Sequence, residues 1–329
     1  MTSRETIGVI GAGAWGTALA QMLASDGREI TLWAFETEVA DAIKTEHRNP
    51  VYLPSAELSR QVKATDDLED LDTLDTILAV TPAQVLGAVL TGLSHSPRDL
   101  VLCSKGIEAG SGRLMNDVAR AACPDSAIAV LSGPTFAHEV AAGLPTAVTL
   151  ACEGGQEQWE RLSPAIARPA FRPYFSDDVT GAEIGGSIKN VLAIACGVVD
   201  GLSLGQNARA ALIARGYAEM LRFGEALGAR AETLAGLCGL GDLVLTCSST
   251  SSRNFSLGKA LGEGKNAAEL MADRTTVAEG AHTAPVLAAL AHQRSLAMPI
   301  VDAVDAILKG ASPRDVVAQL LARPLRPEQ

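Results

Sequence analysis

A glycine-rich turn near the N-terminus constrains the fold of this chain more than any other feature. Gly11, Gly13 and Gly16 form a GxGxxG pattern that follows an apolar run, residues 6–10, and opens a helical stretch, residues 16–25. In a dinucleotide-binding βαβ unit, the first glycine permits the tight turn, the second lets the backbone approach a pyrophosphate, and the third lets the helix pack closely on the strand. The helix N-terminus then faces the phosphate charge. The pattern therefore predicts a Rossmann-type unit that binds a dinucleotide.

Apolar runs alternate with helical stretches through the first half of the chain. Besides the first run, we predict strands at residues 29–34, 76–80, 100–103, 127–130 and 147–150. Near-continuous apolar strands separated by helices are typical of a parallel sheet that is covered on both faces. The first half is therefore predicted to be an α/β Rossmann-type domain with a mostly parallel, doubly wound sheet.

The composition and the hydrophobic periodicity of the sequence change near residues 175–185. The stretches that follow are long, rich in Ala and Leu and helical in period, with no good strand between them: 188–199, 208–227, 284–291 and 299–308. The longest apolar run here has about half the length that a bilayer span requires, so we expect no integral membrane segment. We predict a dinucleotide-binding domain over residues 1–180 and an all-α substrate-binding and catalytic domain over residues 181–329.

The charge balance restricts the class of partner. The chain has 27 Lys and Arg against 38 Asp and Glu, a formal net charge of −11, whereas a general nucleic-acid binder needs a basic face. No two of the six cysteines stand at CxxC spacing, so we expect free thiols in a reducing cytoplasm and no metal site. A homodimer is expected only because dimers are the commonest oligomers.

An acidic residue follows the second predicted strand. Glu36 lies 20 residues after Gly16, where a carboxylate commonly binds the ribose 2′-hydroxyl and repels a 2′-phosphate. No arginine directly follows the strand, so the pattern leans towards NADH over NADPH. A solvated loop charge is the alternative for Glu36, and Phe35 either packs on the adenine or covers the end of the sheet.

Polar residues also follow two later strands, at the sheet edge where open α/β sheets bind their ligands. Lys105 comes after the strand at 100–103, and Gly133 and Thr135 come after the strand at 127–130. A lysine and a Gly-Pro-Thr turn are suited to contact with an anionic ligand through side chain and backbone N–H. An exposed lysine and an ordinary tight turn are the alternatives.

Lys189 precedes a buried apolar helix, and we predict that it exchanges a proton with the substrate. Loss of hydration lowers the pKa of a lysine, and a nearby cation lowers it further. Such a lysine can donate or accept a proton near neutral pH. The alternative is a side chain that extends out of the core to solvent.

A second polar cluster comes later in the chain. Asp242 follows a Gly-x-Gly turn, which we expect to be flexible, and could hold a lysine or a substrate hydroxyl. Ser252, Arg253 and Asn254 form a donor-rich segment matched to phosphate oxygens, with a polar surface loop as the alternative.

Taken together, these motifs make the chain resemble the NAD(P)-dependent glycerol-3-phosphate dehydrogenases of the bacterial type. The resemblance covers nearly the whole chain, in family order and spacing, through residues 11–20, 49–54, 103–108, 131–137, 187–191, 239–243, 252–254, 278–280 and 298–300. It implies reversible hydride transfer between NAD(P)H and dihydroxyacetone phosphate, which gives sn-glycerol 3-phosphate for phospholipid synthesis.

The resemblance also implies roles for single residues. It makes Lys189 the proton donor and acceptor, with Asp242 orienting it. The implied contacts of the phosphorylated substrate are Lys105, Gly133, Thr135, Lys189, Asp242, Ser252, Arg253 and Asn254. The implied contacts of the dinucleotide are Gly11, Gly13, Ala14, Trp15, Gly16, Phe35, Lys105, Ala137, Arg253, Val277 and Glu279.

Two positions depart from the family pattern. Residue 14 is Ala where many members carry Ser, so only its backbone can contact the phosphate. Residue 35 is Phe, followed by Glu36, where many bacterial members have a basic residue or His, which puts their usual NADPH preference in doubt. Residue chemistry alone leaves two other functions open, a related NAD(P)-dependent hydroxy-acid dehydrogenase and a dinucleotide sensor without turnover.

Overall fold

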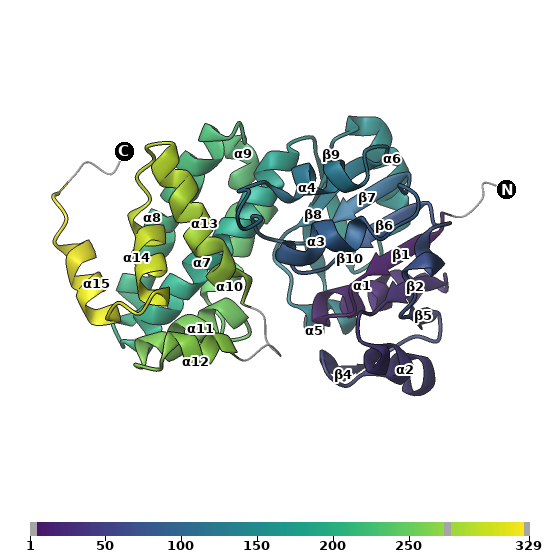
Figure 1. Cartoon of the computed structure of the whole chain (residues 1–329), viewed down its shortest axis with the longest axis horizontal. Coiled ribbons are helices and arrows are strands. Elements are labelled where there is room, and N and C mark those ends of the chain that lie inside the picture. Colours follow the sequence, from purple (N-terminus) through teal and green to yellow (C-terminus); the bar gives the residue numbers. More distant parts are fainter. Residues whose placement is uncertain (1–4, 273–277, 326–329) are drawn as a thin grey trace.

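The computed structural model describes residues 5–272 and 278–325, which form an α/β half and a helical half. The two halves lie side by side along the long axis of the molecule (Figure 1). The last strand of the sheet ends at Ser176, and the first helix of the helical half begins at Val179.

An eight-stranded sheet forms the centre of the α/β half, in the order β10-β9-β8-β7-β6-β1-β2-β5. Its strands are β1 (Ile7–Ile10), β2 (Ile30–Trp33), β5 (Val62–Thr65), β6 (Thr76–Ala79), β7 (Asp99–Leu102), β8 (Ala127–Ser132), β9 (Thr146–Cys152) and β10 (Phe171–Ser176). All neighbours pair in parallel except β8 and β9, which are antiparallel. The order β5-β2-β1-β6-β7-β8 is that of a doubly wound dinucleotide-binding sheet, with its switch point between β1 and β6. The predicted Rossmann-type sheet is confirmed.

Helices cover both faces of this sheet. They are α1 (Ala14–Leu23), α2 (Thr37–Glu46), α3 (Leu86–Leu90), α4 (Met115–Ala122), α5 (Ala137–Ala141) and α6 (Gly155–Ile166). Successive residues of a strand face opposite sides, so Val9 packs in one apolar core with α1, α2, α5 and α6, and Ile10 packs in another with α3 and α4. A small hairpin, β3 (Arg48–Asn49) and β4 (Leu53–Glu57), stands outside the sheet.

The helical half surrounds one central helix, α7 (Val179–Gly201), which is buried along nearly its whole length. The other helices are α8 (Gly205–Ala226), α9 (Ala231–Leu234), α10 (Asp242–Cys247), α11 (Arg253–Gly262), α12 (Ala267–Ala272), α13 (Glu279–Gln293), α14 (Pro299–Leu308) and α15 (Pro313–Leu321). By length and composition α7 could cross a bilayer, but its apolar window is entirely buried inside the protein. It is the core helix of this half.

The structure corrects two local expectations, the start of α7 and the nature of the turn before Asp242. Lys189 lies in the interior of α7, which begins ten residues earlier and passes through Gly185 and Gly186. The Gly-x-Gly segment is a π-helical turn, Leu237–Gly241, that runs directly into α10. Both sets of glycines permit close packing, since a Cβ on Gly185 would lie 2.4 Å from the carbonyl oxygen of Cys238.

Close backbone contact also places α11 against α7. A Cβ on Gly197 would lie 2.0 Å from the carbonyl oxygen of Phe255, and one on Gly258 would lie 2.0 Å from that of Ile194. These glycines let the two helices approach until their backbones touch, which larger residues would prevent. The N-terminus of α11 is thereby held beside the middle of α7.

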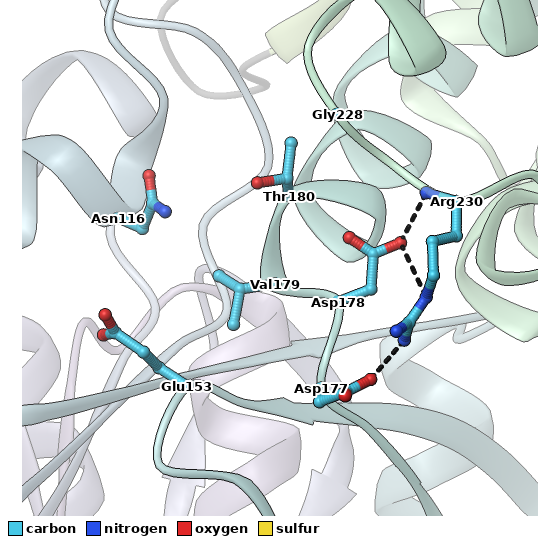
Figure 2. Close-up of a pocket in the computed structure, with 8 residues that line it drawn as sticks. All are labelled: Asn116, Glu153, Asp177, Asp178, Val179, Thr180, Gly228 and Arg230. Atoms are coloured by element: carbon cyan, nitrogen blue, oxygen red, sulfur yellow. Dashed lines mark hydrogen bonds and ion pairs between the residues drawn. The ribbon is translucent and has the colours of Figure 1, made fainter.

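Asp178 anchors the link between the two halves. Its Oδ1 accepts a hydrogen bond from the N–H of Gly181 at 2.8 Å and so caps α7, and its Oδ2 accepts one from the N–H of Arg230 at 2.8 Å. Figure 2 shows the Arg230 guanidinium lying between Asp177 and Asp178. These residues line a hollow of about 380 Å³, which no described residue of the predicted site lines.

We expect Asp178→Ala to lower the free energy of unfolding by about 1–3 kcal/mol, because two backbone N–H groups lose their partner. Chemical denaturation followed by circular dichroism would measure it. Asp177→Ala is the matched control, since Asp177 makes an exposed ion pair with Arg230 and should have little effect. Equal losses in the two variants would contradict the capping role.

Candidate active site

Two lysines and one aspartate meet at the junction of the two halves. Lys189 Nζ lies 2.7 Å from Asp242 Oδ1, and Lys105 Nζ lies 2.7 Å from Asp242 Oδ2. Lys105 follows β7, Lys189 lies on α7 and Asp242 begins α10. The sequence separations are large, yet the structure brings all three predicted residues into direct contact.

Burial controls the charge of Lys189. Its side chain is 9% exposed, and its Nζ also donates to Thr246 Oγ1 at 2.9 Å. Burial lowers the pKa of Lys189 to about 8, the Asp242 carboxylate opposes this shift, and the Lys105 ammonium adds to it. A lysine with this pKa exchanges a proton readily near neutral pH.

Asp242 is completely buried and acts as the shared counter-ion. Burial by itself would raise the pKa of its carboxyl, but Lys105 and Lys189 outweigh burial and hold the pKa below its usual value. The carboxylate therefore stays charged and fixes both ammonium groups in place. Thr246, one turn further along the chain, donates to Asp242 Oδ1 at 3.1 Å.

The loop after β8 closes the side of this cluster. Lys105 Nζ donates to the carbonyl oxygen of Gly133 at 3.3 Å, and the hydroxyl of Thr135 donates to the same oxygen at 3.3 Å. Within the described ranges, the buried hydroxyls of Thr81 and Ser132 have no hydrogen-bond partner. Thr81 follows β6 and Ser132 ends β8, the strands on either side of β7, so they are two further candidate ligand contacts that the sequence did not single out.

The predicted phosphate-binding segment forms the N-terminus of α11. The hydroxyl of Ser252 caps this helix by accepting from the N–H of Phe255 at 3.3 Å. Asn254 Nδ2 donates to Asn190 Oδ1 at 3.0 Å, which ties the segment to the residue after Lys189. Arg253 is exposed beside them, and a helix N-terminus with an exposed guanidinium is suited to a phosphate.

The glycine turn has the form that a dinucleotide pyrophosphate requires. Gly11 has a φ of +107°, and a Cβ on Gly16 would lie 1.8 Å from the carbonyl oxygen of Gly11. A Cβ on Gly13 would meet no atom within 4 Å, so the turn is open on that side. Among the described residues no side chain caps α1, and its first turn has no acidic residue, so the first N–H groups of this helix are suited to an anion.

The remaining predicted dinucleotide contacts extend from this turn in two directions. Ala14 and Trp15 begin α1, and the buried Nε1 of Trp15 has no partner among the described residues. Phe35, two residues after β2, is 79% exposed, and its ring centroid lies 6.2 Å from that of Trp33 in an edge-to-face arrangement. Ala137 begins α5 and packs against the core beneath the sheet.

Glu279 stands on the side nearest the lysines. It begins α13, and its buried Oε2 has no hydrogen-bond partner within the described part of the chain. Burial raises the pKa of Glu279 to about 7, although the N–H of Ala83 and the charge of Arg253 oppose the shift. Unsatisfied buried groups such as Glu279 Oε2 and Trp15 Nε1 fit a ligand that supplies their partners. Val277 lies outside the described residues.

Besides Thr81 and Ser132, three functional candidates were missed by reasoning from the sequence. Thr246 forms hydrogen bonds with both Lys189 and Asp242. Asn190 accepts a hydrogen bond from Asn254, and Tyr52 donates one to Glu36. Thr246 had one available signal, its i+4 spacing from Asp242, which places both on one face of a helix.

A Rossmann domain facing a buried lysine–aspartate pair defines a dinucleotide-dependent oxidoreductase, and comparison with known proteins identifies the family. Residues 6–158 match the sequence family described as the N-terminus of NAD-dependent glycerol-3-phosphate dehydrogenase, and residues 178–318 match its C-terminus. The chain belongs to the NAD-dependent glycerol-3-phosphate dehydrogenase family.

Individual relatives agree with this assignment along the whole chain. The chain is 74% identical to glycerol-3-phosphate dehydrogenase [NAD(P)+] of Erythrobacter litoralis, over 98% of this chain and 97% of that protein. It is 71% identical to the protein of the same name from Novosphingobium aromaticivorans, over 98% of each. The crystal structure of glycerol-3-phosphate dehydrogenase from Coxiella burnetii superposes with a TM-score of 0.92 at 41% identity, covering 97% of this chain and 99% of that one.

Proposed function

We propose that this chain catalyses reversible hydride transfer between NAD(P)H and C2 of dihydroxyacetone phosphate, which yields sn-glycerol 3-phosphate for phospholipid synthesis in the cytoplasm. The observation that supports this most strongly is the buried Lys189–Asp242–Lys105 cluster, together with the polar N-terminus of α11 at Ser252, Arg253 and Asn254. This arrangement supports a proton donor at Lys189 and a phosphate site at the start of α11. We further propose that residues 1–180 bind the dinucleotide, that residues 181–329 bind substrate, and that the enzyme is a homodimer.

The dinucleotide is proposed to lie along the carboxyl edge of the sheet, where the bound nicotinamide supplies or accepts the hydride. Gly11, Gly13, Ala14 and Gly16 would hold the pyrophosphate against the N-terminus of α1. Trp15, Ala137, Lys105, Arg253, Val277 and Glu279 would contact the remainder, and Phe35 would cover the adenine. Glu36, at the N-cap of α2, favours NADH, because its carboxylate repels a 2′-phosphate.

The side chains of the cluster act on the C2 oxygen of the substrate. During reduction, negative charge grows on this oxygen, and the Lys189 ammonium stabilises it and then delivers a proton. In the reverse direction, neutral Lys189 removes the proton from the C2 hydroxyl. Asp242 orients the ammonium and Lys105 adds a second positive charge, while Gly133 and Thr135 close the cleft around the substrate.

The phosphate of the substrate is proposed to bind at Ser252, Arg253 and Asn254. Two cations of the cluster, Lys105 and Lys189, share one carboxylate, so with Arg253 the site has a net positive charge despite the acidic chain. This anionic handle also distinguishes the proposed substrate from hydroxy acids, whose anion is a carboxylate at another distance from the carbonyl. Binding energy at the phosphate positions the reacting carbon.

We expect Arg253→Ala to raise the KM for dihydroxyacetone phosphate by about 10- to 100-fold, because a hydrogen bond to a charged group contributes about 1.5–3 kcal/mol. Initial rates at saturating cofactor, which offsets loss of the proposed Arg253–dinucleotide contact, would be compared with those on dihydroxyacetone, which has no phosphate and should be an equally poor substrate for the variant and the wild type. An unchanged KM for the phosphorylated substrate, or an equal loss on both substrates, would argue against the phosphate role.

A further inference from the structure

The carboxylate of Glu36 is held by a residue from a separate part of the chain. Glu36 occupies the N-cap position of α2 but does not cap that helix with its side chain. Its Oε1 accepts a hydrogen bond from the Tyr52 hydroxyl at 2.8 Å instead. Among the described residues its Oε2 has no hydrogen-bond partner, so one oxygen is anchored and the other is available.

The β3–β4 hairpin, which contains Tyr52, is itself fixed to the glycine turn. Asn49 is completely buried, and its Nδ2 donates to the carbonyl oxygen of Ala12 at 2.7 Å and to Thr17 Oγ1 at 2.9 Å. Asn49 Oδ1 then accepts from the N–H of Tyr52 at 3.0 Å. A single short hairpin therefore contacts the proposed pyrophosphate turn through Asn49 and the proposed ribose carboxylate through Tyr52.

The charges around Glu36 also disfavour an additional phosphate. The hydroxyl of Thr37 donates to Asp66 Oδ2 at 2.9 Å, so a second carboxylate lies close to the start of α2. Lys44, the lysine of this helix, lies 3.7 Å from Asp66 and 3.9 Å from Asp41, so its charge is already shared between two carboxylates. A 2′-phosphate arriving here would meet an anchored carboxylate without an unengaged cation on α2.

We propose that Tyr52 is a specificity-determining positioning residue, which holds Glu36 so that Oε2 receives the ribose hydroxyls of NADH and the carboxylate excludes NADPH. This inference rests on the proposed dehydrogenase function. Tyr52 acts through Glu36 and has no contact with the reacting atoms. Without the Tyr52 hydroxyl, the Glu36 side chain is free to rotate away, which weakens the contact with NADH and lessens the repulsion of NADPH.

The test is the ratio of kcat/KM for NADH to kcat/KM for NADPH, measured with saturating dihydroxyacetone phosphate. We expect Tyr52→Phe to lower this ratio about tenfold, the order expected for one hydrogen bond to a charged group, through a higher KM for NADH with kcat unchanged. Tyr174→Phe is the matched control, since Tyr174 is half-exposed on β10 at the opposite edge of the sheet. The Tyr174→Phe variant should have the same ratio of kcat/KM values as the wild type.

A double-mutant cycle separates positioning from a general effect on the fold. Glu36→Gln should lower the ratio, and adding Tyr52→Phe to it should produce little further change, because Tyr52 acts through the carboxylate. A Tyr52→Phe ratio equal to that of the wild type, or an independent and additive loss in the double variant, would overturn the proposal while leaving the dehydrogenase function intact. A wild-type enzyme that reduces dihydroxyacetone phosphate with neither cofactor would instead overturn the proposed function itself.

Discussion

Lys189→Ala should lower kcat by about 10³- to 10⁵-fold, because the substitution removes both the proton donor and the charge that stabilises the developing alkoxide. The structure supports so large an effect because Lys189 is buried and directly paired with Asp242. Lys105 pairs with the other carboxylate oxygen and cannot replace Lys189 without leaving Gly133. Stopped-flow and steady-state measurements of nicotinamide absorbance would give kcat for both enzymes.

Cofactor binding provides the control for this variant. Lys189 has no contact with the glycine turn, so the affinity for NADH, measured by fluorescence titration, should remain near that of the wild type. Lys63→Ala is a matched lysine variant on the edge strand β5, and its kcat should be unchanged. Turnover of Lys189→Ala near the wild-type rate would contradict the role of Lys189.

Asp242→Asn should lower kcat by about 10²- to 10⁴-fold, because Lys189 then loses most of its capacity to remain protonated. Asp242 raises the pKa of Lys189 against the effects of burial and Lys105. Without that negative charge, two ammonium groups would share a buried site, so the pKa of Lys189 should fall below its present value of about 8. At neutral pH the lysine would then be largely neutral and unable to donate a proton.

The pH profile distinguishes this mechanism from a loss of structure. In the wild type, ketone reduction requires protonated Lys189, so kcat/KM for reduction should fall as the pH rises through about 8. Oxidation of glycerol 3-phosphate requires the neutral lysine and should rise through the same range. In Asp242→Asn the pH at which reduction falls and the pH at which oxidation rises should both be lower. Transitions at the wild-type pH would contradict the proposed pairing.

A matched aspartate controls for the general effect of removing a carboxylate. Asp305 on α14 forms an ion pair with Lys309, the C-cap residue of that helix, away from the cluster, so Asp305→Asn should leave kcat and the pH profile unchanged. Asp242→Asn should also destabilise the fold, by about 3–5 kcal/mol, because it leaves buried cations without their partner. Circular dichroism at the assay temperature establishes that the measured variant is folded.

Much of the α/β half could be predicted because its strands are buried on both faces and so are continuously apolar. Strands β1, β6 and β7 are examples, and each is completely buried. Strands β5 and β10 were missed because they lie at the two edges of the sheet and mix apolar with exposed polar residues. The antiparallel direction of β9 depends on tertiary packing and has no signature in its own residues.

The candidate site was predicted in composition but not in geometry. Lys105, Lys189 and Asp242 could be chosen by their apolar or glycine-rich surroundings, but the sharing of one carboxylate by two lysines required the fold. Lys189 was placed at the start of a helix because Gly185 and Gly186 resemble a helix break. In the structure these glycines instead accommodate Cys238 and the side chains of Lys105 and Ser132. A glycine that breaks a helix in solution can remain within one where a neighbouring backbone packs against it.

The most direct test of the account is the initial rate of NADH oxidation by the wild-type enzyme with dihydroxyacetone phosphate as substrate. NADPH as cofactor, and a 3-oxo acid as substrate, are the comparisons. We predict oxidation of NADH that depends on dihydroxyacetone phosphate, a lower kcat/KM with NADPH, and little activity on the 3-oxo acid. Absence of turnover with either cofactor, or a higher kcat/KM for the 3-oxo acid, would contradict the assignment of this site to a triose phosphate.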